Sequence, residues 1–149
     1  MGVASLISWF VTAFVGLYLL TVWLIENDVS QRAVRSRLPG PVIGGHVLLA
    51  LTGLVIWAAH LVSRSGTLGW TALGMLIVIA VLGVTMFTRW IPVHIEHMAT
   101  DSGKHGRKVA EYDFPAERAF PLPVVLGHGL FASTTFTLVL LAMLGVGGG

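Results

Sequence analysis

Four long stretches of the chain contain no Asp, Glu, Lys or Arg, and they cover residues 1–25, 38–63, 65–88 and 119–149. Each stretch supplies the about 20 apolar residues that a helix needs to cross the hydrocarbon layer of a bilayer. The apolar residues run continuously instead of alternating, which favours helices over the strands of a barrel. The pattern therefore predicts an all-α integral membrane protein, a four-helix bundle with helices near residues 3–25, 41–62, 68–90 and 122–145.

Composition narrows the class of protein further. Hydrophobic residues make up 55% of the 149 residues and charged residues only 11%, where a soluble domain has about 25% charged residues. These proportions exclude an ordinary soluble domain and a disordered chain. With no cysteine, the chain has no disulfide, no iron–sulfur cluster and no covalently attached haem. We expect a single membrane domain over residues 1–149, whose first apolar stretch is a retained span and not a cleaved signal peptide.

The basic residues predict the orientation of the helices. Eight of the nine lie in or beside the first and third connections, and only Arg64 lies in the second. The positive-inside bias makes the side with the eight basic residues cytoplasmic and places both termini outside. We therefore expect a multi-pass protein of the cell membrane (the inner or plasma membrane) in contact with the lipid bilayer. The net charge of +2 is too small to indicate a nucleic-acid partner.

An internal repeat is visible when the chain is displaced along itself. At an offset of 82, residues 39–52 match residues 121–134 in the pattern P-x-P-V-[IV]-x-G-H-x-L-[LF]-A-x-T, with eight of fourteen positions identical. A fainter match at an offset of 67 pairs residues of the first span with the third, and it aligns Gly16, Thr21 and Trp23 with Gly83, Thr88 and Trp90. We infer a duplicated two-helix hairpin, with repeat one at about 1–63, repeat two at about 65–149 and a pseudo-twofold axis along the membrane normal.

The repeat places two histidines at one depth. His46 and His128 each lie five residues after a proline, about 7 Å inward along the helix. Two unprotonated imidazoles that face each other could ligate the iron of one b-type haem, and Gly45 and Gly127 would let the backbone approach the flat macrocycle. Two other interpretations stay open: the histidines form hydrogen bonds between packed helices, or they bind a metal other than haem iron.

His60 lies fourteen residues after His46, on the same face and about 21 Å along the axis. Two histidines at this spacing resemble those of membrane b-type cytochromes, in which one helix serves two stacked haems. The chain departs from that pattern because Ala142 stands at the position equivalent to His60, with Met143 as the nearest alternative ligand. One haem is therefore expected. Arg89 could pair with a haem propionate or extend to the lipid headgroups.

His94 and His97 form a further candidate site. On a continuous helix they would be neighbours and could chelate zinc or copper, but Pro92 predicts that the third helix ends before them. In a loop the two histidines would be solvated, or would bind haem propionates or a quinone.

Two classes of function follow. The first is a membrane electron-transfer subunit that binds one haem b and exchanges electrons with a quinone or with other membrane or peripheral redox subunits. In plan it resembles the membrane anchor subunits of quinone-linked dehydrogenases, which implies an accessory subunit of an oxidoreductase complex and not a complete enzyme. The second is a non-redox assembly or scaffold subunit of a larger membrane complex, or a metal-binding membrane protein. Both a homo-oligomer and a hetero-oligomer are compatible with the sequence.

Overall fold

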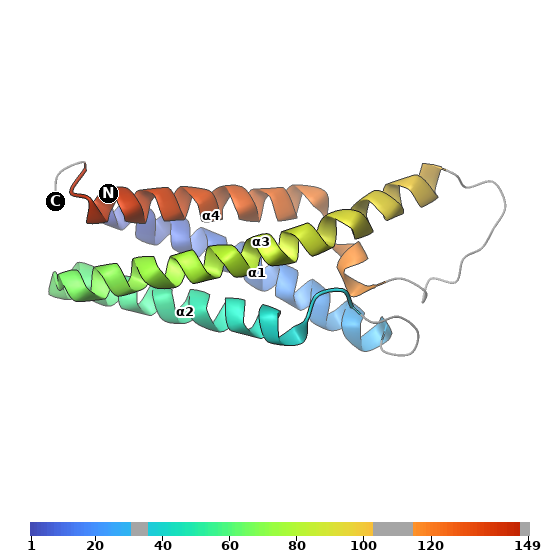
Figure 1. The fold of residues 1–149 in the computed structure, drawn as a ribbon, viewed down its shortest axis with the longest axis horizontal. Coiled ribbons are helices and arrows are strands. Elements are labelled where there is room, and N and C mark those ends of the chain that lie inside the picture. Colours follow the sequence, from blue (N-terminus) through green and yellow to red (C-terminus); the bar gives the residue numbers. More distant parts are fainter. Residues whose placement is uncertain (31–35, 103–114, 147–149) are drawn as a thin grey trace.

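The computed structural model describes residues 1–30, 36–102 and 115–146 and is all-helical over these ranges (Figure 1). Four long helices are present, α1 (Gly2–Ser30), α2 (Gly40–Ser63), α3 (Gly66–Ser102) and α4 (Leu122–Met143), with a short 3₁₀ helix η1 (Ala116–Ala119) before the last. Each long helix is long and apolar enough to cross a membrane. The predicted all-α, four-helix class is confirmed, whereas insertion into the membrane and the orientation there stay predictions.

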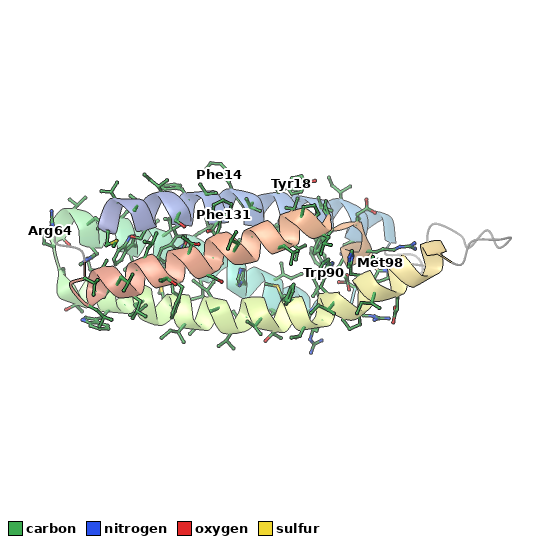
Figure 2. The ribbon with its side chains drawn as sticks, turned by 90° about the horizontal axis from the view of Figure 1, so that it is seen from above. Phe14, Tyr18, Arg64, Trp90, Met98 and Phe131 are labelled. Atoms are coloured by element: carbon green, nitrogen blue, oxygen red, sulfur yellow. The ribbon has the colours of Figure 1, made fainter. Side chains whose placement is uncertain are left out.

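Large apolar side chains cover the outside of the bundle. Phe14 is 69% exposed and Val62 87% exposed, and Figure 2 shows Phe14 and Tyr18 pointing away from the other helices. A soluble protein rarely exposes apolar surface so continuously, because that surface is unfavourable in water. Contact with the hydrocarbon of a bilayer accounts for such an exterior.

Neighbouring helices in the bundle are not simply those that follow one another in the chain. α1 packs mainly on α4 and α2 mainly on α3, while α2 and α4 are diagonal and make no backbone approach to each other in the described ranges. The start of α1, the end of α4 and Arg64 lie at one end of the bundle, called the terminal end below (Figures 1 and 2). The opposite end, formed by residues 36–39, 89–102 and 115–121, is called the charged end below.

The two helices of the sequence repeat begin in the same way. Pro39 and Pro121 are their N-caps and have identical backbone angles, φ −66° and ψ 125°. In both cases the carbonyl of the cap proline accepts hydrogen bonds from the amides three and four residues later. A second proline follows at position 41 or 123, where the missing amide proton has no intrahelical partner to lose.

The expected end of the third helix near residue 90 is wrong. α3 continues through Pro92 to Ser102. A proline inside a helix costs about 3 kcal/mol because it removes one hydrogen bond and crowds the preceding turn. Here the turn around it is held by packing: Trp90 and Val93 are each 3% exposed, and the His94 ring stacks on the Trp90 ring at 4.8 Å.

The core lies toward the end of the bundle that holds the termini. It is formed by side chains of all four helices, namely Trp9, Leu54, Trp57, Ala72, Leu73, Leu76, Ile79 and Val139. Trp57 is fully buried and donates its indole N–H to Ser5 Oγ at 3.0 Å, so its one polar group is satisfied. Gly53 of α2 faces Trp9, and a Cβ atom placed on it would lie 3.0 Å from the indole ring.

This contact gives a stability prediction. Replacing Gly53 with Leu should force Trp9 out of its position and lower the stability by about 1–3 kcal/mol, as overpacking of a core usually does. The matched control is Gly44→Leu, because a Cβ atom at Gly44 has no neighbour within 4 Å. Thermal unfolding in detergent should show a lower midpoint for the first variant only. Equal midpoints would mean that Trp9 does not pack on Gly53.

Candidate functional site

His46 and His128 face each other across the bundle. His46 comes from α2 and His128 from α4, and their ring centroids are 6.3 Å apart with the ring planes inclined by 59°. These two helices are diagonal and do not pack together, so the side chains alone reach across the space between them. A pair of imidazoles at the same depth is the arrangement that the sequence repeat predicts.

The hydrogen bond of His46 determines which of its nitrogens is free. Nδ1 lies 3.1 Å from the carbonyl oxygen of Ile79 on α3. A carbonyl oxygen only accepts hydrogen bonds, so Nδ1 carries the proton and Nε2 carries the lone pair. No described residue forms a hydrogen bond with Nε2 of either ring, and the lone pair of His46 is therefore available to a ligand or metal.

His128 has a similar but looser environment. The Thr12 backbone on α1 faces the His128 ring. Thr12 and Ile79 are equivalent residues of the repeat, because they are 67 positions apart. The contact falls short of hydrogen-bond geometry, and Nδ1 of His128 is buried without a hydrogen-bond partner among the described residues. Buried polar atoms are rarely unpaired, so this ring is the less firmly oriented of the two.

Glycines on the neighbouring helices make room for the rings. A Cβ atom at Gly16 of α1 would lie 2.9 Å from His128 Cε1, and one at Gly83 of α3 would lie 3.3 Å from His46 Cε1. Any larger side chain at these two positions would push the imidazoles aside. The sequence match at an offset of 67 contains both glycines, but the sequence reasoning did not assign them to the site. Gly45 and Gly127, which it did assign, do not line the cavity described next.

A cavity of about 700 Å³ surrounds the two histidines. This volume lies within the range of about 300–1,000 Å³ that is usual for small-molecule sites. The lining contains no Asp, Glu, Lys or Arg, and its polar side chains are mainly histidine, serine and threonine. Its aromatic members come from α1, α3 and α4 and from the segment before α4: Trp9, Trp23, Phe87, Trp90, Phe120 and Phe136.

A buried glutamate at the charged end, beside this cavity, accepts hydrogen bonds from a segment that is distant in the sequence. Glu117 of η1 is 0% exposed, and its carboxylate accepts hydrogen bonds from Ser36 Oγ at 2.8 Å and from the Arg37 amide. Trp23 donates its indole N–H to Ser36 Oγ, and Trp90 donates its own to the Glu117 carbonyl. One carboxylate therefore joins η1 to the segment before α2, next to two tryptophans that line the cavity.

The other predicted residues lie elsewhere. His60 is near the terminal end, where its ring lies 4.9 Å from that of Trp57 at a tilt of 31° and Nδ1 donates to the Ser65 carbonyl at 2.7 Å. Arg89 does not line the cavity but a separate hollow at the charged end. A contact between Arg89 and a haem propionate stays a prediction from the sequence.

The candidate metal site at His94 and His97 lies on α3 and not in a loop, because that helix continues past Pro92. His94 stacks on Trp90, whereas the side chain of His97 is outside the described residues. Within the described parts of the chain, no three His, Asp or Glu side chains are grouped so as to hold a metal ion. Zinc or copper at this position stays a prediction.

Comparisons of this chain with protein-family models, with curated proteins and with solved structures find no match.

The Glu117 contacts give a second stability prediction. Replacing Glu117 with Ala should leave the Ser36 hydroxyl and the Arg37 amide without their acceptor, which usually costs about 1–3 kcal/mol. Tryptophan fluorescence should change as well, because Trp23 and Trp90 join the same network. Glu96→Gln is the control: its ion pair with Arg37 is exposed on both sides, and such pairs contribute at most about 1 kcal/mol. An unchanged midpoint and spectrum for Glu117→Ala would show that the network does not stabilise the fold.

Proposed function

We propose that the protein is a membrane electron-transfer subunit that binds one b-type haem between His46 and His128. The observation that carries this proposal is the separation of the two imidazole centroids, 6.3 Å. Imidazole nitrogens bind metals at about 2.0–2.1 Å, so two rings that bound one metal ion between them would have centroids about 6 Å apart. Rings in direct stacking or hydrogen-bonding contact with each other would be closer.

The surroundings of the histidines also fit a haem. Metal-ligating histidines usually donate their second ring N–H to a carbonyl or carboxylate, as His46 does to Ile79. Gly16 and Gly83 leave space beside the rings, and the cavity around them is apolar. A cavity without formal charge of its own suits a large, mostly apolar macrocycle better than it suits a hydrated metal ion.

The proposed duplication explains why both ligands occur in one short chain. The contact of Gly16 with His128 is related to that of Gly83 with His46 by the two sequence offsets, 67 and 82. At the terminal end, Gly2 beside Leu61 and Gly69 beside Met143 are related in the same way. These equivalent close contacts at two depths support a pseudo-twofold axis. Under the proposed duplication, a single ancestral histidine gives rise to both ligands.

A bound haem would supply one-electron transfer, and the protein would supply its ligation, its burial and its depth in the bilayer. His46 and His128 would hold the haem iron, and the apolar cavity would exclude water from it. We infer that electrons are exchanged with a quinone or a partner subunit, since one redox centre must both receive and release them. The chain itself is then an accessory subunit of an oxidoreductase complex.

The haem proposal predicts an optical signature. Detergent-purified protein expressed with an adequate haem supply should show a Soret band, and dithionite should produce a sharp α-band. His46→Ala and His128→Ala should each abolish six-coordinate binding, and Gly16→Leu should weaken it by displacing the His128 ring. His60→Ala is the matched control, a histidine of the same α2 helix outside the cavity, and it should keep the wild-type spectrum.

Two results would contradict the proposal. A folded wild-type protein with no Soret band would exclude the haem and favour the assembly or scaffold function, with the histidines as part of the helix packing. A haem spectrum that survives both His46→Ala and His128→Ala would exclude these ligands. Circular dichroism of each variant separates loss of haem from loss of the fold.

A further inference from the structure

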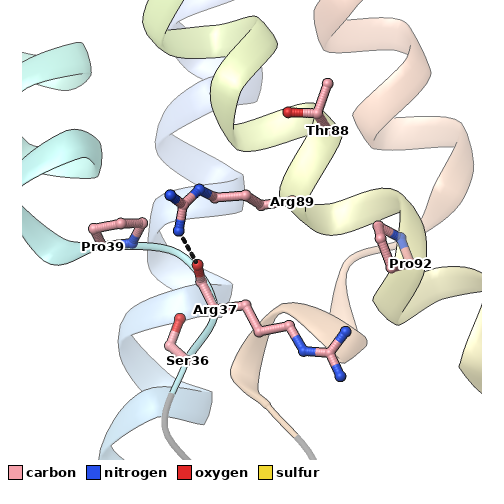
Figure 3. A pocket seen from close by; sticks show the side chains of 6 residues that line it. All are labelled: Ser36, Arg37, Pro39, Thr88, Arg89 and Pro92. Carbon is pink, nitrogen blue, oxygen red and sulfur yellow. Dashed lines mark hydrogen bonds between the residues drawn. The ribbon is translucent and has the colours of Figure 1, made fainter.

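A second hollow, of about 640 Å³, lies at the charged end between the start of α2 and the end of the apolar part of α3 (Figure 3). It shares no lining residue with the histidine cavity. Its lining combines basic, hydroxyl and proline side chains, namely Ser36, Arg37, Pro39, Thr88, Arg89 and Pro92. The hollow is therefore a separate site with its own chemistry.

The two arginines of the hollow differ in their partners. The Arg37 guanidinium binds the Glu96 carboxylate at 3.0 Å, so its charge is balanced. Arg89 donates one N–H to the Arg37 carbonyl at 3.4 Å, as Figure 3 shows, and forms no ion pair with the residues that the structure describes. A guanidinium has five donors, so most of those of Arg89 have no acceptor among the described residues. Arg37, Glu96 and Arg89 together carry one net positive charge.

The position of Arg89 indicates where its anion comes from. Arg89 is the first charged residue along α3, and the candidate span of this helix ends seven residues later at Glu96. Arginine at this level meets the phosphate groups of lipids, and basic pockets between helices on the cytoplasmic side bind anionic lipid headgroups. The rings of Pro39 and Pro92 provide apolar walls for the glycerol and the first acyl carbons.

We propose that this hollow binds the phosphate group of an anionic phospholipid, with Arg89 as the principal ligand. One phosphodiester carries one negative charge and therefore neutralises the net charge of Arg37, Glu96 and Arg89. Bidentate contact with two phosphate oxygens uses the planar donor geometry of arginine. The proposed lipid site does not depend on haem binding, and the proposal stands even if the histidine cavity has another occupant.

Native mass spectrometry of the full chain tests the proposal. Protein released from mixed micelles with equal phosphatidylglycerol and phosphatidylcholine should retain phosphatidylglycerol preferentially. Arg89→Gln should reduce this preference by about fivefold, the effect of one basic side chain at a membrane surface. Arg89→Lys keeps the charge without the planar fork and should give an intermediate value. The matched control is Arg64→Gln, which removes an arginine at the opposite end of the bundle (Figure 2).

Four outcomes would overturn the proposal or its lipid source. Equal retention of the two lipids by the wild-type protein, or an unchanged preference in a folded Arg89→Gln variant, would exclude the site. An equal loss of preference in Arg64→Gln would indicate general attraction of charge and no defined hollow. Displacement of the lipid by millimolar inorganic phosphate would show that free phosphate is the ligand. Thermal unfolding of each variant confirms that the fold is intact.

Discussion

The close approach of α1 to α4 and of α3 to α2 is the contact on which the rest of the structure depends. Apolar burial does little to hold helices together within lipid, because the hydrocarbon chains are as apolar as leucine, so packing at small residues decides which helices associate. Gly16 on α1 faces His128 on α4, and Gly83 on α3 faces His46 on α2. Because a glycine lies directly beside each imidazole, the same contact also sets the depth and direction of the proposed ligands.

The α1–α4 pair and the α3–α2 pair differ most in the polar contacts between their side chains. On the α1 side, the hydroxyls of Ser8 and Thr12 lie 2.8 and 3.2 Å from Thr135 Oγ1 on α4. The equivalent contact on the α3 side is apolar, since Met75 packs on Gly53. The hydroxyl cluster holds α1 against α4 beside His128, the ring whose Nδ1 has no hydrogen bond. We infer that cross-helix hydroxyls position this half of the site, whereas a direct bond to the Ile79 carbonyl positions His46.

Sequence reasoning predicted the features that repeat along the chain, and it missed the features that depend on contacts between helices. Charge-free stretches gave the four helices, and the offset of 82 brought His46 and His128 to one depth. The same reasoning ended the third helix at Pro92, because the packing of Trp90 that outweighs a proline is not visible in a local pattern. It also chose the glycines next to the histidines in sequence, whereas the glycines beside the rings in space belong to other helices. The burial of Glu117 has no signal in the local sequence either, and only the fold shows it.

The charge around the cavity constrains how the proposed haem would be held. The cavity lining contains no charged side chain, so the two propionate groups of a haem would be costly to bury there without partners. The Glu117 carboxylate beside the cavity is itself an anion that accepts hydrogen bonds from Ser36 and Arg37, so it would repel a propionate and would not pair with it. The propionates would therefore have to reach the surface of the bundle, where solvent or lipid headgroups would solvate them. His60 lies outside the cavity near the terminal end and would take no part in holding the haem.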